Sequence, residues 1–449
     1  MKTWKSKRPI SFLLILSLIA AIFISGKFIY TKTHRPKKNV ILIIVDALRP
    51  DHLGCYGYER KTSPNIDNLA KEGVLFTQTI AQGNCTPLSV PSILTSTYPH
   101  THWVKDFGYQ LNPSILTLAQ VLKDYGYSTG FISEPDILHT IRGLERGFDI
   151  FNETGEVTKT AIDWLKDVRD RPFLLYLHYG SPHCPYRPPP PYNRMFLADK
   201  FKRQDKDTLE AKYQWAYDPI YLQIPKQIAE GNLAKEDVDY YISQYDGEIR
   251  FDDQQIGILL KRLKRLNLDK KTIIILTADH GEDLADHDIN NAFKHSSAYD
   301  VVLKVPLIIK CTDIIPENKI ITQQVQSIDI MPTIIDMLKI KKPETTEGVS
   351  LLPLILKGKE YPIPYAFSRS CVIRTEEWKL ICNRRNRQLY NLKKDPQELN
   401  NLIEQEKEKF IFLKEKLDNW RKQAVAIPKK PAQLTEEEKE RLRSLGYLH

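Results

Sequence analysis

Asn-Val-Ile-Leu-Ile-Ile-Val-Asp, residues 39–46, decides the fold: it is a continuous aliphatic run that ends in a carboxylate. Such a run predicts a strand buried on both faces, as in a parallel sheet. Residues 272–280 repeat the pattern as Thr-Ile-Ile-Ile-Leu-Thr-Ala-Asp-His, and residues 173–178 give a third run, Phe-Leu-Leu-Tyr-Leu-His. The carboxyl ends of such strands form the ligand-binding edge of open α/β sheets. We therefore expect the polar residues that end these strands to form a site, with members Asp46, His178, Asp279 and His280.

Helical patterns lie between the predicted strands, at residues 66–72, 115–125, 157–168 and 243–266. This alternation favours an α/β fold, a doubly wound and mostly parallel sheet flanked by helices. The rhythm stops near residue 355, which sets the predicted catalytic domain at 39–355. The remainder, 356–449, predicts a small C-terminal subdomain with a tail. It contains an antiparallel sheet at 366–392 and a charged helix at 396–422.

The N-terminus predicts a membrane anchor over residues 1–38. Eighteen uncharged residues, mostly Leu, Ile, Phe and Ala, lie between Arg8 and Lys27. A helix over about residues 9–26 would rise roughly 27 Å, the thickness of a hydrocarbon core. A cleaved signal peptide is the alternative, but no small-x-small cleavage site follows the apolar run. We expect an uncleaved single-pass anchor, with the N-terminus inside and the catalytic domain extracytoplasmic.

The net charge of +9 does not indicate a nucleic-acid-binding face. Residues 1–38 hold nine of the 65 Lys and Arg and none of the 56 Asp and Glu, so the rest of the chain is formally neutral. No broad phosphate-binding surface is expected from this composition. The expected partners are a membrane, through the N-terminal helix, and no nucleic acid.

The six cysteines are too few for a disulfide scaffold. Cys371 and Cys382 flank a predicted hairpin whose turn is centred on Glu376-Glu377, which places them opposite each other. A cross-strand disulfide would form there only in an oxidising compartment. Two buried thiols are the slightly favoured alternative.

Asp46, Asp279 and His280 are candidate metal ligands at neighbouring strand ends. Carboxylate oxygens favour Ca²⁺, Mg²⁺ or Mn²⁺, and the imidazole shifts the preference toward Mn²⁺ or Zn²⁺. A lone Asp at a strand end more often caps a helix. Two such ends together, one of them followed by His-Gly-Glu, favour a metal site.

Beyond these residues, the sequence resembles the sulfatase family of the alkaline phosphatase superfamily. The resemblance covers nearly all of the chain after residue 38, in order, and is carried by residues 39–58, 62–76, 277–282, 299–309, 389–398 and 434–448. It implies the sulfatase fold and one divalent metal ion, with Ca²⁺ or Mn²⁺ expected and Mg²⁺ or Zn²⁺ left open. It also implies a sulfated or phosphorylated substrate, which could be a sugar, a lipid or a polymer.

The same resemblance implies that Thr86 is the nucleophile and a fourth metal ligand. Family members carry their nucleophile at a helix start about forty residues after the first Asp, and Leu-Thr-Ser-Thr-Tyr-Pro at 94–99 gives the same register. A helix N-terminus and a divalent ion both stabilise an alkoxide. The chain departs from the family at Cys-Thr-Pro-Leu-Ser (85–89), which lacks the Arg of Cys-x-Pro-x-Arg. Cys85 is the alternative nucleophile.

The resemblance further implies that His183 and His295 are catalytic residues that bind the anion or assist the leaving group. His178 and Lys294 are weaker candidates for substrate binding. Three functions follow. The first is a metal-dependent hydrolase of sulfate or phosphate esters. The second is a phosphoglycerol- or phosphoethanolamine-type transferase, or a phosphodiesterase, with a phospho-threonine intermediate. The third is a binding protein that has lost turnover.

Overall fold

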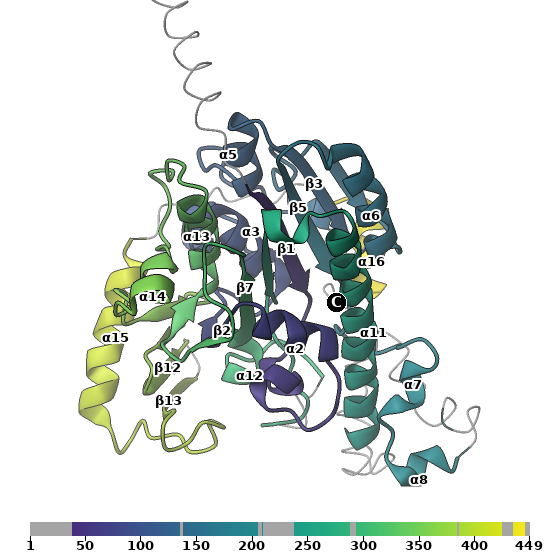
Figure 1. Ribbon diagram of the computed structural model, residues 1–449. Helices are drawn as coiled ribbons and strands as arrows, with labels where there is room; N and C mark the ends of the chain where they lie inside the picture. The colour runs from purple at the N-terminus through teal and green to yellow at the C-terminus, as the bar shows by residue number, and fades with distance from the viewer. Residues whose placement is uncertain are drawn as a thin grey trace, which may run out of the picture.

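The computed structural model describes residues 38–134, 138–204, 209, 238–287, 293–383, 386–423 and 434–444 (Figure 1). The predicted membrane helix at 9–26 lies outside these residues. Within the described ranges, no helix has both the length and the apolar character needed to cross a membrane.

The core is a nine-stranded sheet in the order β4-β3-β5-β1-β6-β7-β2-β8, with β9 also paired to β2. β7 alone runs against its neighbours, so the sheet is mostly parallel, as the sequence predicts. The strands in chain order are β1 Asn39–Val45, β2 Val74–Ile80, β3 Ser128–Ser133, β4 Ile150–Glu153, β5 Phe173–Tyr179, β6 Thr272–Thr277, β7 Lys304–Lys310, β8 Lys319–Ile321 and β9 Val325–Gln326.

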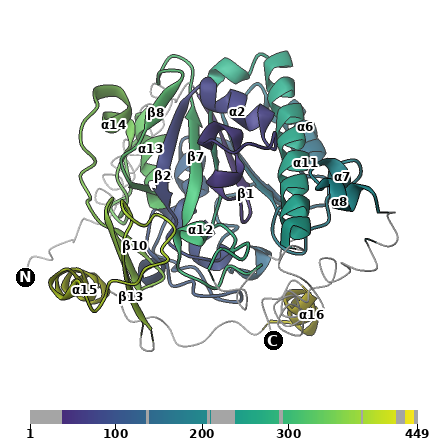
Figure 2. The same ribbon diagram turned by 90° about the horizontal axis from the view of Figure 1, so that it is seen from below.

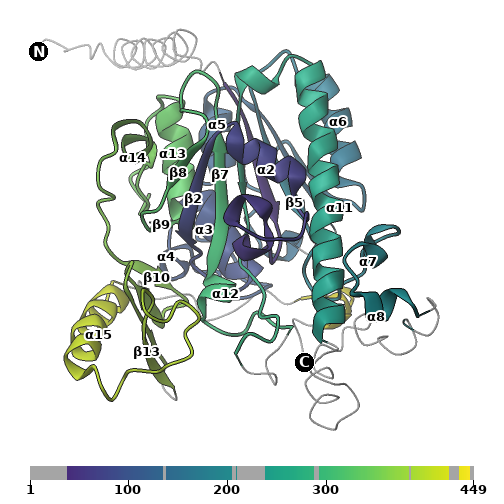
Figure 3. The same cartoon turned by 60° about the horizontal axis from the view of Figure 1, so that its bottom comes forward.

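Helices cover both faces of this sheet because alternate side chains of each strand point to opposite sides. Ile41 and Ile43 of β1 face the core that holds α2 (Pro64–Lys71), α6 (Val157–Val168) and α11 (Val238–Arg265). Leu42 and Ile44 face the core of α3 (Thr86–Thr95), α5 (Leu118–Asp124), α13 (Ile330–Met337) and α14 (Leu352–Lys357). α6 and α11 lie side by side along one face (Figure 3). Each fully buried aliphatic side chain contributes roughly 1.5–3 kcal/mol.

The helix predicted at 157–168 has these bounds in α6, whereas the start of α5 differs from the prediction. The sequence pattern placed that start at residue 115, but the helix begins at Leu118. Thr117 accepts a hydrogen bond from the Gln120 amide, and the Gln120 side chain accepts one from the Thr117 amide. This capping box fixes the helix start. The shorter helices are η1 Pro50–His52, η2 Gly54–Tyr56, α4 Pro99–His102, η3 Leu138–Thr140, α7 Tyr192–Met195, α8 Asp199–Lys202, η6 Asp269–Lys271, α12 Asp300–Leu303 and η8 Ser327–Asp329.

The predicted C-terminal antiparallel sheet is present as β10 (Ala366–Ser368), β11 (Val372–Arg374), β12 (Trp378–Cys382) and β13 (Arg387–Asn391), and Figure 2 shows it beside α15 (Lys407–Arg421). The charged helix was predicted from residue 396, which is wrong by eleven residues because α15 begins at Lys407. The carboxylate of Asp395 accepts hydrogen bonds from the amides of Leu399 and Asn400, which holds this segment in a turn. The last helix is α16 (Glu436–Ser444).

The hairpin that carries Cys371 and Cys382 has the predicted register. Val372 pairs with Ile381, and the Cys382 amide donates a hydrogen bond to the Cys371 carbonyl over 2.8 Å. Both cysteines are free thiols, so the cross-strand disulfide, the less favoured of the two predictions, is not formed.

Candidate active site

The polar strand ends meet at one edge of the sheet, as predicted. β1 lies between β5 and β6, with Ile44 opposite both His178 and Thr277, so Asp46 follows directly beside both neighbours. His280 Nε2 lies 3.3 Å from Asp46 Oδ1 and 3.6 Å from Asp279 Oδ2. His178 Nε2 lies 3.5 Å from Asp46 Oδ2. All four side chains are buried.

Four buried atoms at this edge fit a metal ion. Asp46 Oδ1, Thr86 Oγ1, Asp279 Oδ2 and His280 Nε2 make no hydrogen bond of ordinary geometry with the described residues. Buried polar atoms are rarely left without a partner, since this costs about 1–3 kcal/mol each. Three oxygens and one imidazole nitrogen are a donor set suited to a divalent cation. Ligand atoms of Asp46, Asp279 and His280 all lie within 4.8 Å of one another.

The carboxylates of Asp46 and Asp279 also favour a bound cation. Burial and the negative charge of Asp279 raise the pKa of Asp46 well above its ordinary value. Burial raises the pKa of Asp279 too, but its neighbours His280 and His178 outweigh this and lower it. Two buried carboxylates this close ionise together only when positive charge lies between them.

Thr86 is the first residue of α3, and its side chain is buried. Cys85 precedes it in an extended conformation, and the Cys85 carbonyl accepts hydrogen bonds from the amides of Leu88 and Ser89. Pro87 and the extended residue before the helix are typical of a helix start. Burial raises the pKa of the Cys85 thiol to about 12.

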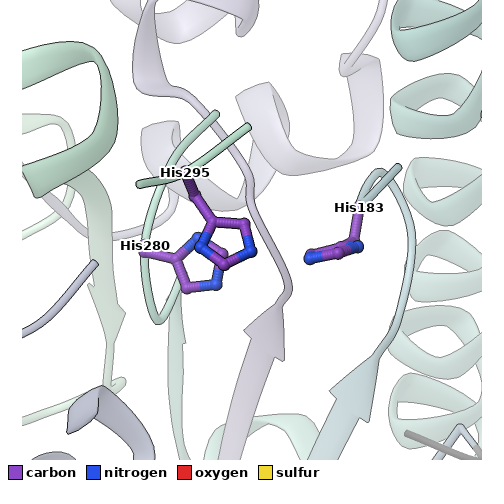
Figure 4. Close-up of side chains that lie close together, drawn as sticks. All are labelled: His183, His280 and His295. Carbon is purple, nitrogen blue, oxygen red and sulfur yellow. The ribbon is translucent and has the colours of Figure 1, made fainter. Parts of the chain in front are cut away.

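His183 and His295 join His280 in a cluster of three imidazoles, drawn in Figure 4. The ring centroids of His280 and His295 lie 4.5 Å apart, those of His183 and His295 5.1 Å, and those of His183 and His280 6.1 Å. Nδ1 of each ring lies within hydrogen-bond distance of a backbone carbonyl: Cys184 for His183, Gly281 for His280 and Asn84 for His295. A carbonyl only accepts, so Nδ1 carries a proton in each of the three rings.

His183 and His295 are neutral at pH 7. Burial and the neighbouring His280 lower the pKa of His183 to about 4. The same two causes, with His183 in addition, lower the pKa of His295 well below its usual range. Each ring therefore offers an Nε2 that can accept a proton or ligate a cation, rather than a permanent positive charge.

The remaining predicted residues lie near this cluster. His178 is fully buried behind Asp46, and its Nδ1 lies 3.0 Å from the Tyr176 hydroxyl. Lys294 pairs through its backbone with Asp283.

Two further residues were not anticipated. Asn84 binds both backbone and ring of His295, and Arg369 reaches from the C-terminal subdomain to the carbonyls of Ser296 and Ser297. No sequence pattern marks Arg369, which lies far along the chain from Thr86.

The fold and this site define a hydrolase of the alkaline phosphatase superfamily, and comparison with known sequences gives the family. The sulfatase family model matches residues 38–340, so the chain belongs to the sulfatase family. The C-terminal region of N-sulphoglucosamine sulphohydrolase matches residues 290–423. The chain is 24% identical to N-acetylglucosamine-6-O-sulfatase of Bacteroides thetaiotaomicron, over 83% of each protein.

Solved structures share the fold. One, described in complex with its substrate D-glucosamine-2-N,6-O-disulfate, superimposes with a TM-score of 0.70 at 20% identity, over 89% of this chain and all of that one. Phosphonate monoester hydrolase of Agrobacterium radiobacter superimposes with a TM-score of 0.68 at 22% identity, over 89% of this chain and 98% of the other. The chain is thus a sulfatase-family hydrolase with both sulfatases and phosphonate hydrolases among its neighbours.

Proposed function

We propose that this protein is a metal-dependent sulfatase whose nucleophile is the hydroxyl of Thr86. The observation that carries the proposal is the group of four buried, unsatisfied atoms at the start of α3: Thr86 Oγ1 together with one atom each of Asp46, Asp279 and His280. This arrangement supplies an unmodified hydroxyl, rather than a formylglycine, at the place where the ester would be attacked.

Asp46, Asp279 and His280 would hold the divalent ion, which when bound lowers the pKa of a coordinated hydroxyl and neutralises an anionic ester. The Thr86 hydroxyl loses its proton as its oxygen bonds to sulfur, and the bond from sulfur to the ester oxygen breaks. Water then cleaves the threonine sulfate ester and releases sulfate. The helix N-terminus of α3 favours negative charge at this position.

The neutral Nε2 atoms of His183 and His295 suit a proton relay. Either ring can accept the proton that Thr86 releases and then donate it to the leaving oxygen. Their carbonyl-bound Nδ1 atoms hold the rings in the tautomer that this requires. His178 has a different place, since it contacts Asp46 from the buried side and serves there as a positioning residue.

A phosphoester reaction is the second candidate, and the unmodified Thr86 favours it. Threonine cannot become formylglycine, and a phospho-threonine intermediate needs only the hydroxyl. A phosphonate monoester hydrolase with the same fold supports this candidate. Release to water would give a phosphodiesterase, and release to an acceptor hydroxyl a transferase.

The test compares substrates and nucleophile variants of the full chain, purified and supplied with Mn²⁺ or Ca²⁺. We expect turnover of an aryl sulfate that exceeds turnover of the matching aryl phosphate and phosphodiester. Thr86→Ala should abolish it, Thr86→Ser should retain part of it, and the matched neighbour Cys85→Ala should leave it within a few fold. Loss in Cys85→Ala with full activity in Thr86→Ala would overturn the proposed nucleophile. Faster turnover of the aryl phosphate or the phosphodiester would show that the natural substrate is a phosphoester rather than a sulfate ester.

A further inference from the structure

A cavity of about 860 Å³ lies between the catalytic domain and the C-terminal subdomain. One wall comes from α3 and α4, through Leu88, Pro99 and His100. The opposite wall comes from the small sheet and α15, with Arg387 and Trp420 among its residues. Small-molecule binding pockets commonly occupy about 300–1,000 Å³.

This cavity adjoins the candidate active site. Leu88, in its wall, lies two residues after Thr86 on the same helix. Arg369, in the opposite wall, donates hydrogen bonds to the carbonyls of Ser296 at 2.7 Å and Ser297 at 3.2 Å, which directly follow His295. The cavity therefore lies next to the residues that follow Thr86 and His295 in the chain.

The cavity lining carries positive charge only. No Asp or Glu is among the residues that line the cavity. The lining includes five Lys and Arg residues: Lys105, Arg369, Arg387, Lys414 and Arg421. Lys414 and Arg421 share the carboxylate of Asp418, whereas Lys105 and Arg387 form no ion pair within the described part of the chain. A concave surface of one charge sign concentrates field and attracts ligands of the opposite sign. The charge stands out because residues 39–449 are formally neutral.

We propose that this cavity, here called the basic cleft, binds a second anionic group of the substrate, next to the ester that Thr86 attacks. The role of the basic cleft rests on the proposed function. It narrows the substrate class to saccharides that carry a further sulfate or carboxylate. Arginine guanidinium groups match the geometry of both anions with paired N–H donors. Pro99, His100 and Trp420 also line the cleft, and the last two are largely buried.

Binding is measured by calorimetry with heparin-derived tetrasaccharide on the full chain carrying Thr86→Ala, so the result does not depend on turnover. Lys105→Glu and Arg387→Glu reverse the two exposed charges without touching the catalytic group. The matched control, Lys359→Glu, reverses an exposed lysine outside the cleft. We expect about tenfold weaker binding for the two cleft variants combined, and an unchanged Kd for the control.

A second measurement separates the cleft from the chemistry. With the wild-type nucleophile restored, the two reversals should lower kcat/KM for the tetrasaccharide more than kcat/KM for a small aryl sulfate, because only the tetrasaccharide carries a second anion. The proposed role of the basic cleft is wrong if the variant with both reversals binds the tetrasaccharide with wild-type affinity, or if neutral maltotetraose binds equally well. It is also wrong if the reversals weaken binding to phosphatidylglycerol vesicles instead of binding to the tetrasaccharide. If the protein does not turn over aryl sulfate but still binds the tetrasaccharide through the cleft, the proposed sulfatase activity is wrong and the proposed role of the cleft stands.

Discussion

Asn84 and His295 bind each other twice. The His295 Nδ1–H donates to the Asn84 carbonyl over 2.7 Å, and the Asn84 side-chain amide donates to the His295 carbonyl. Asn84 lies two residues before Thr86, so this exchange joins the start of α3 to the loop that carries His295. The distance between the proposed nucleophile and one proposed proton acceptor is thus set by two hydrogen bonds, each from a side chain to a backbone carbonyl.

We expect Asn84→Ala to lower kcat for an aryl sulfate about tenfold. The variant removes one amide donor, a loss of roughly 0.5–1.5 kcal/mol, and leaves the His295 carbonyl without it. Asn112→Ala is the matched control, because it deletes a side-chain hydrogen bond to the Thr101 carbonyl in a different loop. Equal kcat values in both variants would show that the loop junction does not position the site.

Gly281 separates His280 from Glu282, and its backbone is packed against Val301. A Cβ at this position would lie 2.2 Å from the Val301 carbonyl oxygen, closer than real contacts allow. Gly281→Ala must therefore shift the loop that carries His280 and the carbonyl that binds its ring. We expect Mn²⁺ affinity, measured by calorimetry, to fall at least about tenfold, or 1.4 kcal/mol.

The control for this prediction is Gly155→Ala, where an added Cβ meets nothing within 4 Å. It should keep wild-type Mn²⁺ affinity and melting temperature. Unchanged metal affinity in Gly281→Ala would mean that His280 does not depend on this loop geometry, and would weaken its assignment as a ligand.

The sequence predicts the strand ends well and the long-range contacts poorly, for physical reasons. Asp46 and Asp279 each end an aliphatic run, and the parallel pairing of β1 with β6 then brings them together. Arg369 belongs to no periodic pattern, and only tertiary folding places it beside the loop after His295. The start of α5 was misplaced because the Thr117 capping box competes with hydrophobic periodicity.

Asp300 connects the catalytic domain to the C-terminal sheet through buried charges. Its carboxylate accepts hydrogen bonds from Arg374 Nη2 at 2.9 Å and Lys379 Nζ at 2.8 Å. Lys379 also lies 2.8 Å from Glu398, and its side chain is completely buried. The two strands of the hairpin that carry Arg374 and Lys379 are therefore fixed to α12 by ion pairs shielded from solvent.

Lys379→Met should destabilise the protein by about 3–5 kcal/mol, because it leaves Glu398 and part of Asp300 buried without their shared cation. Urea unfolding at pH 7 measures this difference. Lys393→Met is the matched control: its ion pair with Glu377 is exposed and 3.9 Å long, so the change should stay within about 0.5 kcal/mol. Similar stabilities for the two variants would contradict a stabilising role of the buried network.

The same network predicts a pH dependence that Asp300→Asn should remove. Burial alone would raise the pKa of Asp300, but Arg374 and Lys379 outweigh it and hold that pKa well below its ordinary value. The folded protein thus binds the proton less readily than the unfolded chain. The resulting stabilisation is fully present above the unfolded pKa, near 4, and is lost as the pH falls toward the folded pKa. Below about pH 4, the wild type should lose up to about 1.4 kcal/mol of unfolding free energy per pH unit relative to Asp300→Asn.

Urea unfolding of both proteins at pH 6, 4 and 3 measures the difference in their unfolding free energies. Asp170→Asn, a substitution of an exposed carboxylate, is the control and should follow the wild type. A gap that stays constant from pH 6 to 3 would show that the Asp300 carboxylate is not stabilised by its two cations.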